Sequence, residues 1–340
     1  MSRIDSNYVH QGRSARKVER AGSATDLFGP VDPARHKQAQ QLYRHLATAL
    51  HPDRVDAHDT RAHAAAAELN RLHHEWRHAT PVDLHTDRTT YRLTQRHAVG
   101  SVTNLYRTDG PHVVKVVRNP ALNPLLHAEW DALRRLARFT DQHRWLRPYY
   151  PHLVDTSGDV TRGSRAFTVL APLVDGFVTL ADIRRAHPRG LDGRDYAWMH
   201  RRLLRAIAGA HRTGLVHGAI TADNVLVHPR EHGIVLAGWT FAVTAGERLL
   251  ATDKTTHYPP EVHRGQPVTP ATDIHMAHTL MLELLAHNET AQRRFAHGCT
   301  QDDPDRRPDA VDLLTEYDDL LHELHGERTF RPFATPRTGA

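Results

Sequence analysis

The stretch from Gly214 to Ala242 reads GLVHGAITADNVLVHPREHGIVLAGWTFA. Two short apolar runs, 225–227 and 234–236, are separated by a segment that carries Pro229 and Gly233. β-Branched runs separated by turn residues are typical of two strands joined in a hairpin. The stretch therefore predicts a β-hairpin, and the rest of the chain is organised around it.

Two polar residues lie just before the predicted hairpin, His217 and Asn224, seven positions apart. This spacing resembles the catalytic loop of a protein kinase, H-R-D-L-x-x-x-N, which is followed by D-F-G. Here Ala219 stands at the catalytic Asp, and Gly238 stands at the metal-binding Asp. The resemblance implies a Ser/Thr pseudokinase of the bacterial, actinobacterial type.

Earlier residues resemble the small lobe of a kinase. Strands are expected at 91–93, 101–106 and 113–117, because apolar residues there are separated by Gly100 and by Asp109-Gly110, a strong hairpin signal.

Within the last of these strands, Lys115 resembles the Lys of V-A-I-K, and Glu129 on a helix expected over 125–139 resembles its partner. In a kinase this pair holds the α/β-phosphates. The resemblance thus implies ATP or ADP as the ligand, with Mg²⁺ held weakly or not at all. The residues it implies for the nucleotide are Gly100, Lys115, Glu129, Ala171 and Asn224. Only one glycine of G-x-G-x-x-G survives, which weakens the cradle for phosphates.

Later landmarks resemble the large lobe. Tyr258-Pro259-Pro260-Glu261 is similar to A-P-E, Asp273 to the Asp that starts the central helix, and Arg307 to the Arg that pairs with the A-P-E Glu. We expect Glu261 and Arg307 to form a buried structural salt bridge.

The first 80 residues have a different pattern. Apolar residues recur every three or four positions from Pro33 to Leu50 and again from Arg61 to Arg77, which predicts two antiparallel helices. The joint reads His51-Pro52-Asp53. This resembles the J domain of Hsp70 co-chaperones, and it implies an Hsp70-type chaperone as partner. The expected contact residues are His51, Pro52, Asp53, Arg35, Lys37 and Arg44. The alternative is a helical hairpin whose HPD is a chance helix stop.

Composition excludes several classes of protein. Lys+Arg 44 against Asp+Glu 39 gives a net charge of only +5, so no nucleic-acid partner is expected. No apolar run approaches the roughly 20 residues of a membrane span, and no signal peptide is evident. The single cysteine, Cys299, favours a reducing, cytoplasmic location and reads as a buried apolar residue. No metal-ligand spacing of histidines and carboxylates appears.

The expected fold class is α+β in two domains: a small all-α J-type helical hairpin, then a bilobal protein-kinase-like fold with a β-rich small lobe and an α-rich large lobe. The expected segments are a disordered tail (1–23), the J-like domain (24–80), a linker (81–90), the small lobe (91–173), the large lobe (174–325) and an extended tail (326–340).

Two functions stay open. The first is a non-catalytic scaffold that recruits an Hsp70 through His51-Pro52-Asp53 and an unknown client or regulator through the kinase-like domain. The second is an ATP-dependent Ser/Thr kinase or another nucleotide-dependent transferase with an atypical site, built from Lys115, Glu129 and Asn224. The missing Asp residues favour the scaffold, because they supply the base and the metal ligand in phosphoryl transfer.

Overall fold

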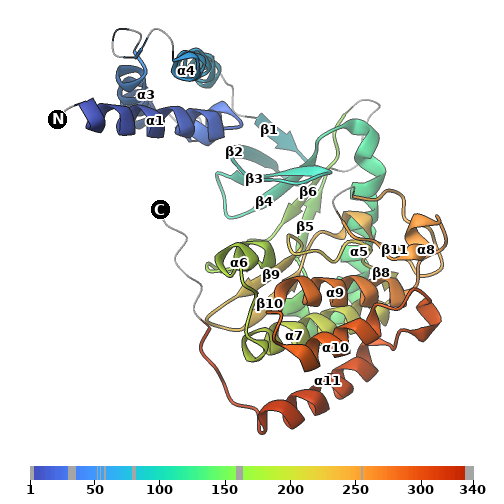
Figure 1. Ribbon diagram of the computed structural model, residues 1–340. Coiled ribbons are helices and arrows are strands. Elements are labelled where there is room, and N and C mark those ends of the chain that lie inside the picture. The colour runs from blue at the N-terminus through green and yellow to red at the C-terminus, as the bar shows by residue number, and fades with distance from the viewer. Residues whose placement is uncertain are drawn as a thin grey trace. The chain divides into compact units, whose positions relative to one another are not determined.

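The computed structural model describes residues 4–29, 36–51, 53, 55–56, 59–78, 82–157, 164–253 and 256–333 (Figure 1). The chain divides into two compact units, residues 1–116 with 157–159 and residues 117–156 with 160–340. This division falls within the expected small lobe, since the helix that carries Glu129 belongs to the second unit.

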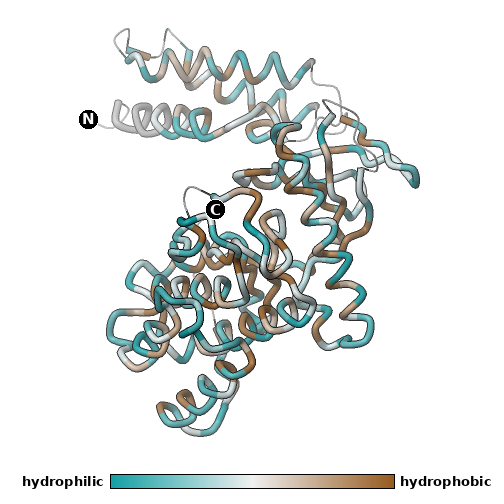
Figure 2. The backbone as a smooth tube through the Cα atoms, turned by 90° about the vertical axis from the view of Figure 1, so that its right-hand side faces the viewer, coloured by the Kyte–Doolittle hydropathy of each residue, from teal (hydrophilic) through white to brown (hydrophobic). Residues whose placement is uncertain are grey.

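The first unit begins with four helices, α1 (Ile4–Arg20), α2 (Ala24–Phe28), α3 (His36–Ala49) and α4 (Thr60–His78). Leu46 and Leu50 at the end of α3 and Leu69, Leu72 and Trp76 of α4 share one buried core, as their spacing predicts. In Figure 2 hydrophilic and hydrophobic residues alternate along the coloured parts of these helices, the pattern of helices that bury one face. The expected helix start at Pro33 lies outside the described residues.

The N-terminal segment expected to be disordered contains α1, so that prediction was wrong. Ala15 and Val18 of α1 are buried in the same core, and α1 packs against α4. Glu19 also forms a bidentate pair with Arg61, with both N–O distances at 2.6 Å. Ala15 and Val18 lie among charged neighbours, and their burial depends on the contact between α1 and α4.

The remainder of the first unit is an antiparallel sheet in the order β1-β2-β3-β4, made of β1 (Val82–His85), β2 (Thr90–Val99), β3 (Thr103–Thr108) and β4 (Val113–Val117). The linker expected over 81–90 was wrong, because β1 pairs with β2 from Val82↔Leu93 to His85↔Thr90. β2 is longer than predicted, and it includes Arg96, whose guanidinium lies 2.6 Å from the carboxylate of Asp26 in α2.

The second unit is mostly helical. Its helices are α5 (Asn123–Gln142), α6 (Leu180–Ala186), α7 (Gly193–His211), α8 (Pro260–His263), α9 (Pro270–Leu284), α10 (Thr290–Cys299) and α11 (Ala310–His325), with 3-10 turns at Pro120–Leu122, Arg144–Tyr149, Trp239–Phe241 and Pro304–Arg306. They surround one large core that includes Leu203, Leu236 and Met281. Cys299 is buried at the end of α10, as expected, and burial raises the pKa of its thiol to about 12.

Short strands complete this unit. β5 (Leu153–Thr156) pairs with β6 (Phe167–Leu170), β8 (Leu215–Val216) pairs with β11 (Val243–Thr244), and β9 (Val225–His228) lies between β7 (Val178–Thr179) and β10 (Gly233–Leu236). The hairpin predicted from the opening stretch is confirmed, with Ile234 opposite Val227 and Leu236 opposite Val225.

Across the described ranges, no helix is both long enough and apolar enough to cross a bilayer.

Candidate active site of a kinase-like fold

The loop between β8 and β9 is held in place by Asp273 in the first turn of α9. Asp273 is fully buried, and its carboxylate accepts hydrogen bonds from the backbone N–H of His217 at 2.8 Å and of Gly218 at 2.9 Å. His211 at the end of α7 contributes a third contact at 3.0 Å. A carboxylate with three such contacts fixes the backbone of the loop.

His217 is a structural side chain in this loop. Its Nδ1 accepts from the backbone N–H of Ala219 at 3.2 Å, so the proton of the neutral ring is on Nε2, which donates to the carbonyl of Ala237 at 2.8 Å. The ring also contacts the indole of Trp239, with centroids 4.5 Å apart. His217 therefore ties the loop to the end of β10.

Trp239 fills the core next to His217. It is fully buried, and its Nε1 donates to the carbonyl of Leu236 at 2.8 Å. Trp239, which follows Gly238, therefore packs the core.

Ala219 and Asn224 face each other across the loop. Ala219 is buried at 1% exposure and offers only a methyl group. The Asn224 amide donates from Nδ2 to the Ala219 carbonyl at 2.8 Å. Asn224 thus has an internal partner at the position where the kinase resemblance implies a metal ligand.

Gly238 leaves no room for a side chain. Its φ of +79° lies in the left-handed region, and a Cβ built on it would lie 2.2 Å from Oδ1 and 2.3 Å from Cγ of Asn224. Contacts below 3.0 Å require something to move. The Asn224 amide therefore occupies the space in which a carboxylate from position 238 would begin.

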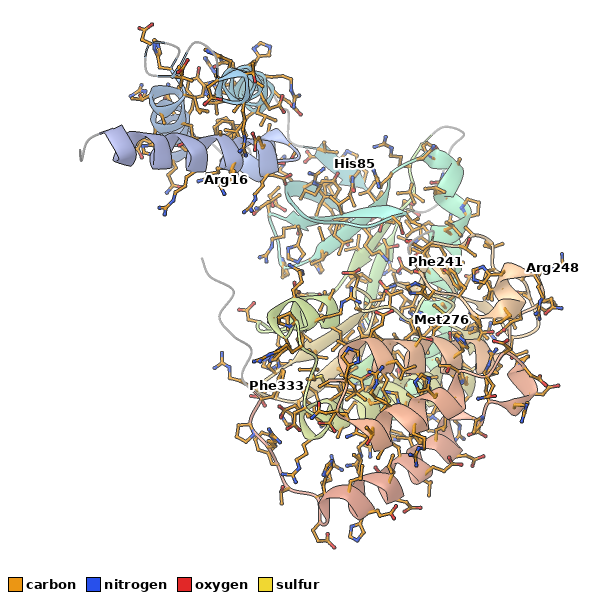
Figure 3. The ribbon with its side chains drawn as sticks, viewed as in Figure 1. Arg16, His85, Phe241, Arg248, Met276 and Phe333 are labelled. Carbon is orange, nitrogen blue, oxygen red and sulfur yellow. The ribbon has the colours of Figure 1, made fainter. Side chains whose placement is uncertain are left out.

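Gly218 is similarly enclosed. It has a φ of +69°, and an added Cβ would lie 2.7 Å from Cδ2 of Leu249 and 2.9 Å from the carbonyl oxygen of Phe241. In the resemblance to H-R-D, Gly218 stands at the Arg, and here it is packed against Leu249. Phe241, labelled in Figure 3, is itself buried.

Glu261 and Arg307 form the ion pair expected between them. Arg307 contacts the two carboxylate oxygens at 2.7 and 3.0 Å, and the side chains are 4% and 0% exposed. The guanidinium also donates to the carbonyls of Gln301, Ala271 and Asp302, and Thr272 donates to Glu261. Every donor of Arg307 is satisfied, so this buried pair meets the condition under which such pairs are tolerated.

The residues suggested for a nucleotide belong to both units. In the first unit, Gly100 is in a tight turn that closes with its N–H on the Thr103 carbonyl at 2.8 Å, and Lys115 is buried on β4. In the second unit, Glu129 is 2% exposed on α5 and accepts from Thr168 at 3.3 Å, whereas Ala171 follows β6.

The residues suggested for a chaperone partner are exposed where they are described. The side chain of His51 is 56% exposed and that of Asp53 is 86% exposed, and their Nδ1 and Oδ2 are 3.5 Å apart. Lys37 and Arg44 are exposed on α3. Arg35 and Pro52 lie outside the described residues.

Two carboxylates of the described residues, Asp223 and Asp273, belong to this loop or bind it. Asp223 is exposed, and Asp273 is buried and holds His217, Gly218 and His211. Within the described ranges, no group of three or more His, Cys, Asp and Glu residues is placed to hold a metal ion. The contacts of Asp273 and His217 hold the backbone of the loop in one conformation. The contact of His211 with Asp273 was not predicted from the sequence, because nothing in the spacing of His211 indicates it.

The fold is kinase-like. A solved structure of vaccinia related kinase 3 is similar to this chain with a TM-score of 0.57, covering 73% of this chain and 92% of that chain at 17% sequence identity. At such low identity the likeness concerns the fold alone. No protein-family model matches the chain.

Proposed function

We propose that this chain is a non-catalytic scaffold, in which a J-type helical domain recruits an Hsp70-type chaperone and a pseudokinase domain binds a client or regulator. The observation that carries the proposal is the Asn224 amide seated over Gly238, 2.2 Å from where a Cβ would lie.

The chemistry of phosphoryl transfer supports this reading. Kinases use one Asp to accept the proton of the attacking hydroxyl and another to hold Mg²⁺. Ala219 cannot accept a proton, and Gly238 carries no ligand. Loss of a general base alone costs about 10²–10⁴-fold in rate. A domain with both losses retains the surfaces of a kinase without its reaction.

The exposed residues of the helical domain support the partner. Asp53 presents a solvent-exposed carboxylate beside His51, and Lys37 and Arg44 present positive charge on α3. A carboxylate next to a basic helix face is complementary to a partner with an arginine and an acidic surface. The helical domain would act by binding and would perform no chemistry.

A phosphotransfer assay tests the pseudokinase part. The full-length protein is incubated with labelled ATP and Mg²⁺, with generic protein substrates and an active kinase run in parallel. We expect no label on this chain or on the substrates. Incorporation that disappears in Lys115→Ala would overturn the proposal.

An ATPase assay tests the chaperone part. The full-length protein is expected to accelerate ATP hydrolysis by an Hsp70 from the same source, and His51→Gln is expected to abolish the acceleration. His287→Gln, which alters an exposed histidine of the second unit, is the matched control and should behave as wild type. Absence of stimulation at saturating protein would contradict the chaperone role.

A nucleotide-dependent transferase is the second candidate, and burial of Lys115 and Glu129 favours it. They are 7% and 2% exposed, which is uncommon for charged side chains. Thermal-shift measurements with ATP and ADP, each with and without Mg²⁺, separate the candidates. A Mg²⁺-dependent rise of the melting temperature that Lys115→Ala removes would favour the transferase.

A further inference from the structure

The tail after α11 lies along the edge of the second unit. From Gly326 the chain runs from the end of α11 toward α6 without regular structure (Figure 1). Three side chains of this tail, Phe330, Arg331 and Phe333, contact a surface that we call the tail groove. The tail groove consists of His187, Asp192, Asp195, Trp198 and His232.

Aromatic rings provide the apolar contacts in this groove. Phe333 is 6% exposed, and its centroid lies 5.7 Å from that of His187 and 6.4 Å from that of Trp198. Figure 3 labels Phe333 at this edge of the unit. Phe330 stacks on His232 with centroids 4.5 Å apart, although 70% of it stays exposed. One phenylalanine is thus an anchor and the other covers the rim.

Two carboxylates recognise the cation between the phenylalanines. Arg331 Nε lies 2.8 Å from Asp195 Oδ1, and its Nη1 lies 3.4 Å from Asp192 Oδ1. Asp192 caps the N-terminus of α7, and Asp195 belongs to its first turn. Burial raises the pKa of Asp195, an effect that the positive charge of Arg331 opposes. A cation therefore suits this end of the groove.

Two elements, α7 and the β9–β10 hairpin, form the aromatic part of the groove. The rings of Trp198 from α7 and His232 from the β9–β10 hairpin are stacked with centroids 4.1 Å apart and planes 3° from parallel. His232 has a φ of +53°, a left-handed conformation that non-glycine residues rarely adopt. The hairpin thus accepts an unfavourable backbone conformation at the residue whose ring also contacts Phe330.

The tail does not satisfy the groove completely. The buried indole Nε1 of Trp198 has no hydrogen-bond partner among the described residues. Arg331 remains 43% exposed, and Phe330 is mostly in solvent. The tail leaves Phe330 and Arg331 partly in solvent, so a segment in trans that presents the same groups can compete for the groove.

We propose that the tail groove is a peptide-docking site for extended partner segments of the type aromatic–Arg–Pro–aromatic, and that the chain's own Phe330–Phe333 occupies it as a competing ligand in cis. The occupant is argued from the chemistry of the bound tail: an aromatic anchor between His187 and Trp198, and an arginine on two aspartates three and six residues before Trp198. The tail groove is a different surface from the β8–β9 loop, so peptide binding there is independent of the scaffold function.

The attached tail lowers the apparent affinity of the groove for a free peptide. A segment attached by a short linker competes at an effective concentration in the millimolar range. A free peptide of the same sequence should therefore bind the intact protein weakly, and should bind much more tightly once the attached segment is weakened.

Fluorescence anisotropy with a labelled peptide of sequence ERTFRPF, residues 327–333, tests this. The full chain with Phe330→Ala and Phe333→Ala is expected to bind the peptide at least 10-fold more tightly than wild type. Arg331→Glu, which leaves the buried aromatic contacts in place, should raise affinity for the peptide as well. A thermal melt of each variant verifies that it is folded.

Further substitutions locate the binding. Asp195→Asn in the double-Ala background should weaken the peptide at least 10-fold, whereas Asp312→Asn, in the first turn of α11, should have no effect. A peptide with both phenylalanines replaced by alanine should not bind. Equal binding to wild type and to the tail variants, no binding to either, or insensitivity to Asp195→Asn would overturn the proposal.

Discussion

Removal of one partner of the Glu261–Arg307 pair should be among the most damaging single changes in the second unit. Arg307→Met keeps much of the volume of the side chain but removes all its donors. Among the described residues, the Glu261 carboxylate, 4% exposed, would then retain only Thr272 as side-chain donor. Three backbone carbonyls would lose their arginine donor at the same time.

The expected cost follows from the burial. Breaking a buried ion pair by removing one partner costs about 3–5 kcal/mol, because the remaining charge has no compensation. For a unit of this size, 1 kcal/mol lowers the melting temperature by about 2–4 °C. The melting temperature of Arg307→Met should therefore fall by about 6–20 °C.

The pair should also give a signature at low pH. Burial opposes ionisation of Glu261, but hydrogen bonds and charge from Arg307 outweigh it, so the pKa lies below its ordinary value of 4.5. A depressed carboxyl pKa stabilises the folded state above the unfolded-state pKa, and this contribution is lost as pH falls through the folded-state pKa. Wild type should lose this contribution below pH 4.5, and Arg307→Met should not show that loss.

Calorimetry and urea unfolding followed by tryptophan fluorescence provide the measurement. The matched control is Arg184→Met, which breaks the exposed pair with Glu283 and should cost about 0–1 kcal/mol. The double variant Glu261→Leu/Arg307→Met should recover much of the loss, since no charge remains buried. A loss below 1 kcal/mol in Arg307→Met, or one equal to that of Arg184→Met, would refute the reasoning.

Three further outcomes are expected. Gly238→Ala should destabilise the protein by about 1–3 kcal/mol more than Gly246→Ala, measured by urea unfolding: both have a positive φ, but the added Cβ meets Asn224 at the first position and nothing within 4 Å at the second. His278 is fully buried, and burial lowers its pKa to about 4. Because the unfolded chain then binds the proton more readily, the unfolding free energy should fall as pH drops from 6.5 to 4, and His278→Gln should reduce that slope. Cys299, 3% exposed, should react with a thiol reagent only after urea unfolds the protein, and reaction of the native protein would contradict its burial.

Much of the hairpin region could be predicted from sequence. The runs 225–227 and 234–236 are apolar and rich in β-branched residues, and they lie on either side of turn residues, so local preference and tertiary structure agree. The same agreement holds for α5 and α7, whose apolar residues recur at helical spacing.

Other elements depend on contacts that a local pattern does not contain. The helix α1 buries only Ala15 and Val18 of its described side chains in the core, and the strand β1 exposes Val82 by 54%, so neither has a strong periodic signal. The seat of Asn224 over Gly238 requires a φ of +79° at one residue and a neighbour fourteen positions away. The sequence shows that position 238 lacks an Asp, but it does not show that the Asn224 amide occupies the space.

The contact between Asn224 and Gly238 also constrains how this chain can change over time. A mutation that places an Asp at position 238 meets the Asn224 amide, and a mutation that moves Asn224 breaks its bond to Ala219. Each step alone lowers stability before any benefit of the other is available, and position 219 requires a third change. A carboxylate pair is therefore harder to regain by evolution from this sequence than a new binding surface is to acquire, because single substitutions at positions 224 and 238 lower stability first.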